Sequence, residues 1–142
     1  MRNRIRLLIS LCVAALAATA MSCATTKTDV DATPTARMKV DAHVGKGWNS
    51  DSTKIENISS SFRPEDVIYA VVDVSGGDSG TLIGRWSNAS GNVVLEQTST
   101  IVAGQRNYPF KLIGVPLTAG DYKFEAWLNG KMEDAEHFKV ES

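Results

Sequence analysis

The sequence predicts an all-β domain of the sandwich type, and three observations support this. From about residue 37 onward, apolar and polar residues alternate in one segment after another, which is the period of strands with one buried face. Turn-forming residues separate these segments at intervals of about 8–12 residues, as is typical of β-sandwiches. Asn129-Gly130, between two alternating segments, is the strongest short-range signal for a β-hairpin. We therefore expect about seven or eight antiparallel strands and no helix in residues 37–142.

The first part of this region contains two expected strands separated by an irregular segment. Met38–Val44 alternates between apolar and polar residues, so we expect a half-buried strand there. Residues 45–63 are polar, with Gly45 and Gly47 near their start, and we expect a loop. Val67–Val74 is apolar on both of its faces, which indicates a central strand of a sheet.

The rest of the region is predicted to be a series of strands joined by tight turns. Asn88–Asn92 and Ala103–Gln105 contain the asparagine and glycine residues that such turns favour. Tyr122–Leu128 alternates strictly, so we expect its even-numbered side chains to face the core. The expected strands are 81–87, 93–101, 108–112, 122–128 and a closing strand that contains Phe138 and Val140.

Two features resemble immunoglobulin-like sandwiches. Leu117–Tyr122 resembles the tyrosine corner, in which a tyrosine at the start of the penultimate strand bonds back to the backbone a few residues upstream. Trp86 matches the position of the core tryptophan, although the paired cysteines of antibody domains are absent. The resemblance covers residues 37–142 and implies an immunoglobulin-like β-sandwich. It implies no particular function, because such domains serve as adhesion modules, sugar binders, inhibitors and assembly subunits.

Residues 1–22 have the parts of an export signal. Three arginines in the first six positions precede a mostly apolar run, Leu7–Leu16, and the small residues of Ala17–Ala20 follow. The uninterrupted apolar run has only about ten residues, whereas a membrane-spanning helix needs about 20. We therefore expect a signal peptide rather than a retained anchor helix.

Ala20–Cys23 resembles the lipobox of bacterial lipoproteins, with Ala20 where leucine is commonest. The resemblance implies that Cys23 is acylated and becomes the new N-terminus, so that lipid holds the protein on a membrane of the cell envelope. Residues 23–36 are polar and rich in threonine and alanine, as expected of a flexible tether. The alternative is plain secretion, with Cys23 left as a free or pairing thiol.

The charge balance excludes one class of partner. The whole chain has 15 basic and 16 acidic residues, and three of the basic residues lie in the signal, so the mature protein would carry about −4. A mildly acidic surface argues against binding of DNA, RNA or anionic headgroups through charge. Cys12 leaves with the signal and Cys23 would carry lipid, so we expect no disulfide in the domain.

The sequence predicts no enzyme, no cofactor and no metal site. His43 and His137 are the only histidines, and each lies on the polar side of an expected strand. With no cysteine in residues 37–142, these ligands are too few for a zinc site. A Gly-x-Ser-x-Gly motif is absent, and the serines of 59–61 have no evident histidine partner.

Trp48 and Trp127 are the candidate binding residues. Trp127 falls on the polar face of its expected strand, and Trp48 lies in a glycine-flanked polar segment. Such tryptophans stack on sugars or anchor protein partners, but residues 45–63 could instead fold over the sheet and cover Trp127. We expect a non-catalytic envelope protein that acts as an interaction or accessory subunit, for example by strand addition at a sheet edge. A carbohydrate-binding module that uses both tryptophans is the alternative, and a protease inhibitor is a third option.

Overall fold

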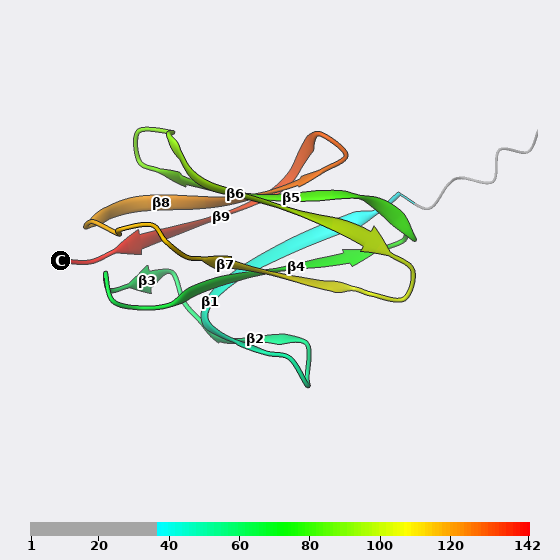
Figure 1. Ribbon diagram of the computed structural model, residues 1–142, viewed down its shortest axis with the longest axis horizontal. Helices are drawn as coiled ribbons and strands as arrows, with labels where there is room; N and C mark the ends of the chain where they lie inside the picture. The colour runs from blue at the N-terminus through cyan, green and yellow to red at the C-terminus, as the bar shows by residue number, and fades with distance from the viewer. Residues whose placement is uncertain (1–36) are drawn as a thin grey trace, which may run out of the picture. The chain divides into compact units, whose positions relative to one another are not determined.

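The computed structural model describes residues 37–142, which form two β-sheets lying face to face (Figure 1). The signal, the acylated Cys23 and the tether predicted above lie outside the described residues. The strands are β1 (Lys39–Asn49), β2 (Lys54–Ile58), β3 (Ser61–Phe62), β4 (Ile68–Ser75), β5 (Ser79–Asn88), β6 (Val93–Val102), β7 (Asn107–Leu112), β8 (Gly120–Leu128) and β9 (Lys131–Val140). Sheet A has the order β2-β1-β4-β7, and sheet B has the order β3-β9-β8-β5-β6. The predicted all-β sandwich is confirmed at this level.

The structure confirms the expected strands and adds two short ones. The prediction of a loop over residues 45–63 is wrong, because this stretch contains the end of β1 and all of β2 and β3. The described region therefore has nine strands rather than seven or eight. The prediction failed because Gly45 does not mark a loop. It allows β1 and β2 to lie close together, since a Cβ atom at this position would lie 2.7 Å from the carbonyl oxygen of Glu56.

β1 pairs with two different strands along its length. Its first part, Lys39–Gly45, is antiparallel to β4, and its second part, Gly45–Asn49, is antiparallel to β2. This change of partner at Gly45 lets the β1–β2 hairpin leave the plane of sheet A. Figure 1 shows β2 on the side of sheet A that faces away from sheet B.

The core lies between the inner faces of the two sheets and is rich in aromatic rings. Trp86 is fully buried, with its ring centroid 4.6 Å from that of Phe124 and 6.0 Å from that of Phe138. Phe110, from sheet A, reaches sheet B and lies 5.6 Å from Phe124. Gly84 of β5 makes room for this contact, because a Cβ atom there would lie 2.6 Å from the Phe110 ring. The even-numbered side chains of β8 face this core, as predicted.

Two buried tyrosines tie the turns to the strands that follow them. The Tyr122 hydroxyl accepts a hydrogen bond from the Thr118 N–H at 3.2 Å and donates one to the Thr118 carbonyl at 3.1 Å. The Tyr108 hydroxyl accepts from the Val102 N–H at 3.1 Å and donates to the Gln105 carbonyl at 3.1 Å. Each hydroxyl thereby satisfies backbone groups that the sheet ladders leave unpaired.

The predicted hairpin between β8 and β9 is also present. Asn129 and Gly130 both have positive φ angles, 49° and 83°, which is the conformation of a type I′ turn. The Asn129 side chain also accepts a hydrogen bond from the Thr81 N–H at 2.9 Å, so the turn is tied to β5.

The part of the chain that the structure describes contains no helix that could span a membrane.

Substitution of Gly84 by alanine tests the close packing of the two sheets. We expect Gly84→Ala to lower the free energy of unfolding by about 1–3 kcal/mol, because the added methyl group would overlap the buried Phe110 ring. Urea denaturation followed by circular dichroism measures this. Gly47→Ala, whose new Cβ would meet only the Glu56 side chain, is the matched control and should have a much smaller effect. Equal effects of the two substitutions would contradict the packing argument.

Candidate functional site

β6 is a long edge strand with little to obstruct it. It has ten residues, and β5 is the strand with which it pairs. It contains no proline and no lysine, and its one charged residue, Glu96, forms an ion pair with Arg85 at 2.8 Å. Proline, lysine and unpaired charge are the features by which proteins protect such an edge from pairing with other chains. β6 is therefore open to an additional strand.

Alternate backbone groups of β6 point away from β5. The Val102 N–H is bound by the Tyr108 hydroxyl at the end of the strand, so it faces the open side. Because strand residues alternate with a period of two, the N–H and C=O groups of Glu96, Thr98 and Thr100 face the same side. These residues form a row of donors and acceptors along the edge, which we call the β6 edge.

The remaining outer strands are each obstructed. β7, at one end of sheet A, contains Pro109 and Lys111. β2, at the other end, has five residues, among them Lys54 and Glu56. β3 has only two residues. Short length, proline and charge all oppose pairing with another chain, so in the described region the β6 edge is the most accessible to a partner.

Acidic side chains protect the place where β1 and β9 approach each other. Asp134 Oδ2 accepts a hydrogen bond from the Ala42 N–H at 2.7 Å and so occupies a free backbone donor of β1. The pKa of the nearby Glu136 is raised, mainly because burial disfavours the charged form and secondarily because of the Asp134 charge, while His43 and His137 act in the opposite direction. Carboxylates at this position make strand addition costly.

The β1–β2 hairpin covers part of the outer face of sheet A. Asn107 of β7 donates hydrogen bonds through Nδ2 to the carbonyl and hydroxyl oxygens of Thr53, at 2.8 and 2.9 Å, and thereby joins the tip of the hairpin to the far edge of the sheet. Val71 points outward from the central strand β4, yet only 2% of it is exposed. The outer face of β4 is therefore covered at Val71.

Trp48 lies in a cleft beside this hairpin. The cleft has a volume of about 710 Å³ and lies between the hairpin and the start of β7. Its lining residues are Trp48, Thr53, Gly104, Gln105, Arg106, Asn107 and Pro109. We call it the Trp48 cleft. A smaller hollow of about 270 Å³ shares Thr53 and Asn107 with this cleft. Its lining also includes His43 and Val71.

Trp127 lies on the opposite side of the molecule from the hairpin. Its neighbours in sequence, Ala126 and Leu128, are buried in the core, so the strand period places Trp127 on the outer face of sheet B. The Arg85 guanidinium lies over its ring, 4.5 Å from the centroid, and its indole Nε1 is buried without a hydrogen-bond partner in the described region. The structure therefore does not bring Trp48 and Trp127 together in one surface.

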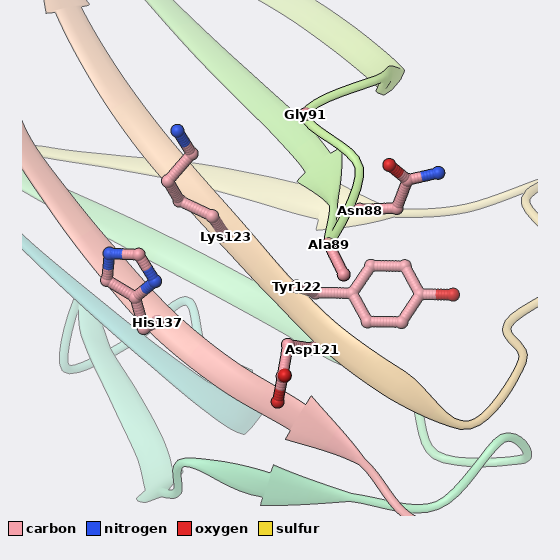
Figure 2. A pocket seen from close by; sticks show the side chains of 7 residues that line it. All are labelled: Asn88, Ala89, Gly91, Asp121, Tyr122, Lys123 and His137. Atoms are coloured by element: carbon pink, nitrogen blue, oxygen red, sulfur yellow. The ribbon is translucent and has the colours of Figure 1, made fainter.

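A third hollow lies beside the turn between β5 and β6 (Figure 2). It has a volume of about 250 Å³, and its polar lining includes Asp121, Lys123 and His137. The Lys123 ammonium is already paired with Glu125 at 2.7 Å, and the Tyr122 hydroxyl is used by its bonds to Thr118. The hollow therefore lacks a free nucleophile next to a base.

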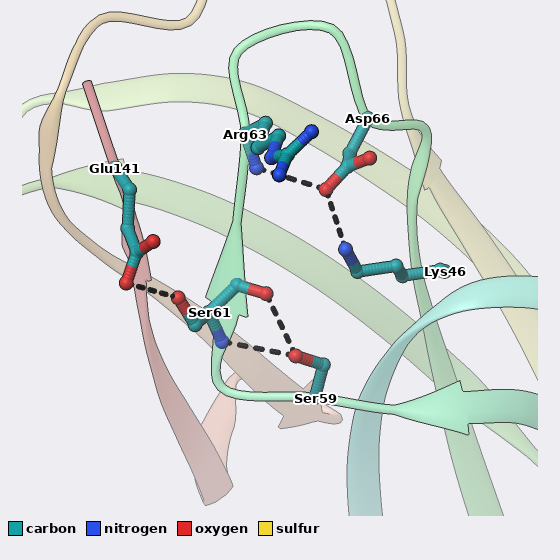
Figure 3. A network of polar contacts seen from close by, with 6 residues as sticks. All are labelled: Lys46, Ser59, Ser61, Arg63, Asp66 and Glu141. Carbon is teal, nitrogen blue, oxygen red and sulfur yellow. Dashed lines mark hydrogen bonds and ion pairs between the residues drawn. The ribbon is translucent and has the colours of Figure 1, made fainter.

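A polar network fixes the segment around β3 (Figure 3). Lys46 donates to Asp66 Oδ2 at 2.7 Å, and the Arg63 N–H donates to the same oxygen at 2.8 Å. The hydrogen bond from Lys46 is the main reason why the pKa of Asp66 is lowered. The Ser61 hydroxyl donates to Glu141 at 2.7 Å. These bonds join three segments and have a structural role.

The histidines are not brought together into a metal site. His43 lies 3.8 Å from Asp41 on the outer side of β1, and His137 is exposed on β9. In residues 37–142, no three histidine, cysteine, aspartate or glutamate residues lie close enough together to hold a metal ion.

Removal of the Glu136 charge should stabilise the domain at neutral pH. Because the pKa of Glu136 is raised in the folded state, its ionised form opposes folding once the pH exceeds that pKa. We expect Glu136→Gln to raise the Tm at pH 7. The gain should shrink as the pH falls through the raised pKa, and it should vanish below the ordinary glutamate pKa of about 4.3. Thermal melts across this pH range, with the exposed Glu65→Gln as control, measure it. A lower Tm at pH 7 would contradict the argument.

The chain was also compared with known proteins. No protein-family model matches it, and no curated protein matches its sequence. A β-sandwich is shared by proteins of many unrelated functions, so the fold alone assigns none. Two features of the described region, the β6 edge and the Trp48 cleft, offer chemistry that a partner or ligand could use.

Proposed function

We propose that this protein is a non-catalytic, lipid-anchored protein of the cell envelope that binds an extended segment of a partner protein by strand addition to the β6 edge. The observation that carries this proposal is the contrast between β6 and the other outer strands. β6 has ten residues without proline or lysine, whereas the others are short, charged or interrupted. In strand addition, backbone hydrogen bonds supply affinity and alternate side chains supply specificity.

The side chains of β6 suggest the character of the partner segment. Val94 and Leu95 are half-buried and pack against the core, so a partner residue beside them would be apolar. Thr98 and Thr100 lie on the outer side, where polar or β-branched partner residues fit well. Glu96 is neutralised by Arg85, so charge would select little. The expected segment alternates between apolar and polar residues and has few charges.

We also infer that the domain is immunoglobulin-like. The bonds between Tyr122 and Thr118 have the pattern of a tyrosine corner, and Trp86 is buried at the centre of the core.

The anchoring part of the proposal rests on the lipobox-like Ala20–Cys23. Each buried methylene group of an acyl chain contributes about 0.8 kcal/mol, so two or more chains would hold the protein on a membrane without a spanning helix. The anchor would place the β6 edge among the other proteins of the envelope, where its partner would be met.

Proline at position 98 tests the role of the β6 edge. The Thr98 N–H faces the open side, so Thr98→Pro removes a donor from the edge while the hydrogen bonds to β5 remain. We expect a photo-crosslinking residue at position 100 to capture a discrete partner in membranes. Thr98→Pro should reduce this product by about tenfold, because it removes one hydrogen bond to the partner strand and its ring hinders the approach of that strand.

The matched control is Thr98→Ala, which changes the same side chain but keeps the N–H. It should leave the crosslinked product nearly unchanged. A crosslinker at Lys111, on the obstructed strand β7, should give no such product. If Thr98→Pro and Thr98→Ala behave alike while both variants keep the circular dichroism spectrum of the unmodified protein, the proposed contact is wrong.

Replacement of Cys23 by serine tests the lipid anchor separately. Serine cannot be acylated at this position by lipoprotein processing, so we expect Cys23→Ser to move the protein from the membrane fraction to the soluble fraction. Cell fractionation with immunoblotting measures this. Cys12→Ser, within the expected signal, is the control and should leave the protein on the membrane. Retention of Cys23→Ser in the membrane fraction would exclude lipid anchoring at this residue.

A further inference from the structure

We propose that the Trp48 cleft is a binding site for an oligosaccharide that carries carboxylate groups. This site is separate from the β6 edge, so either proposal can fail without the other. The cleft volume of about 710 Å³ lies within the range of about 300–1,000 Å³ that is usual for small-molecule sites.

The cleft is held open by contacts within the protein. Asn107 of β7 forms two hydrogen bonds with Thr53 at the hairpin tip, and Val71 of β4 is buried beside the hairpin. Thr53 also has a positive φ angle of 51°, an uncommon conformation for threonine. A site fixed in this way loses little conformational entropy when a ligand binds.

The contact between Asn107 and Thr53 leaves one polar atom of the Asn107 side chain without a partner. The Oδ1 atom of Asn107 is buried without a hydrogen-bond partner in the described region. A buried polar atom without a hydrogen-bond partner destabilises the folded state. Asn107 also lines the cleft, so a ligand bound there would lie next to this side chain.

The lining of the cleft combines apolar and polar groups as a sugar requires. Trp48 and Pro109 supply apolar surface, which suits the C–H face of a pyranose ring. Gln105, Arg106 and Thr53 supply side chains that bond to hydroxyl groups. The Gln105 amide already donates to the Asn107 carbonyl, and the Thr53 hydroxyl already accepts from Asn107 Nδ2. Of the three, Arg106 therefore gains most from a polar ligand.

The positive charge of Arg106 indicates that the sugar carries a negative charge. Of the described residues that line the cleft, Arg106 is the only charged one. It also borders a hollow that includes Asp41 and Asp73, but the described region contains no ion pair between its guanidinium and either carboxylate. Guanidinium groups bind carboxylates through paired hydrogen bonds. One cation in a mildly acidic protein is too little for a nucleic acid, which needs several phosphate contacts. Proline-rich peptides usually dock in grooves with several aromatic residues, whereas this cleft has one.

Calorimetric titration of the full-length protein in detergent tests the proposal. The probes are a hexamer of galacturonic acid, neutral cellohexaose and a proline decamer. We expect binding of the acidic hexamer alone, with a change in tryptophan fluorescence and an affinity that falls as the salt concentration rises. Absence of binding by the acidic hexamer, equal binding of cellohexaose, or preferential binding of the proline decamer would each overturn the proposal.

Matched variants locate the site. Trp48→Ala should weaken binding of the acidic hexamer by about 30-fold, as for a residue central to a binding site. Arg106→Gln should weaken it by about tenfold through loss of a charged hydrogen bond. Trp127→Phe, on the other sheet, should leave it unchanged. Arg106→Gln keeps the test valid if Trp48→Ala lowers stability, which melting curves would reveal. Binding that neither Trp48→Ala nor Arg106→Gln affects would overturn the assignment.

Discussion

The need to satisfy backbone hydrogen-bonding groups at the edges of two open sheets governs much of this structure. Two sheets that do not close into a barrel leave outer strands with unpaired N–H and C=O groups. The chain meets this need in several ways: Asp134 binds the Ala42 N–H, proline interrupts β7, and β2 and β3 are short. The Tyr108 hydroxyl covers only the last residue of β6. The proposed partner contact is the one long edge of the described region that these devices leave open.

The aromatic core and the β1–β2 hairpin determine how the two faces of sheet A are used. On the inner face, Phe110 crosses toward Phe124 over the space that Gly84 provides, and this contact holds the sheets together. On the outer face, the hairpin buries Val71 and is held by Asn107. The middle of β4 is thus covered on both sides. The same arrangement creates the Trp48 cleft, so packing and the proposed sugar site depend on one structural feature.

Most of the fold could be predicted because its signals are local. Asn129-Gly130 adopts positive φ angles that only a few residue types accept readily, so the hairpin could be located in advance. The bonds of Tyr122 span four residues and were likewise visible as a motif. The segment 45–63 could not be predicted in the same way. Gly45 is required by a contact with the backbone of Glu56, and glycine in a polar segment predicts a loop unless that partner strand is known.

For the candidate sites, the residue types follow from the sequence, whereas long-range contacts in the folded domain bring particular residues together. Alternation along β8 was sufficient to place Trp127 on an outward face, because side-chain direction in a strand has a period of two. Only the folded chain showed that Arg85 covers this ring and that Trp48 lies on the other sheet, beside Arg106 and Pro109. The openness of β6 was hidden for the same reason. Residues that are apolar on both faces marked β4 as an inner strand, but which strands lie at the edges depends on pairings between distant segments, and the half-polar pattern of β6 does not reveal them.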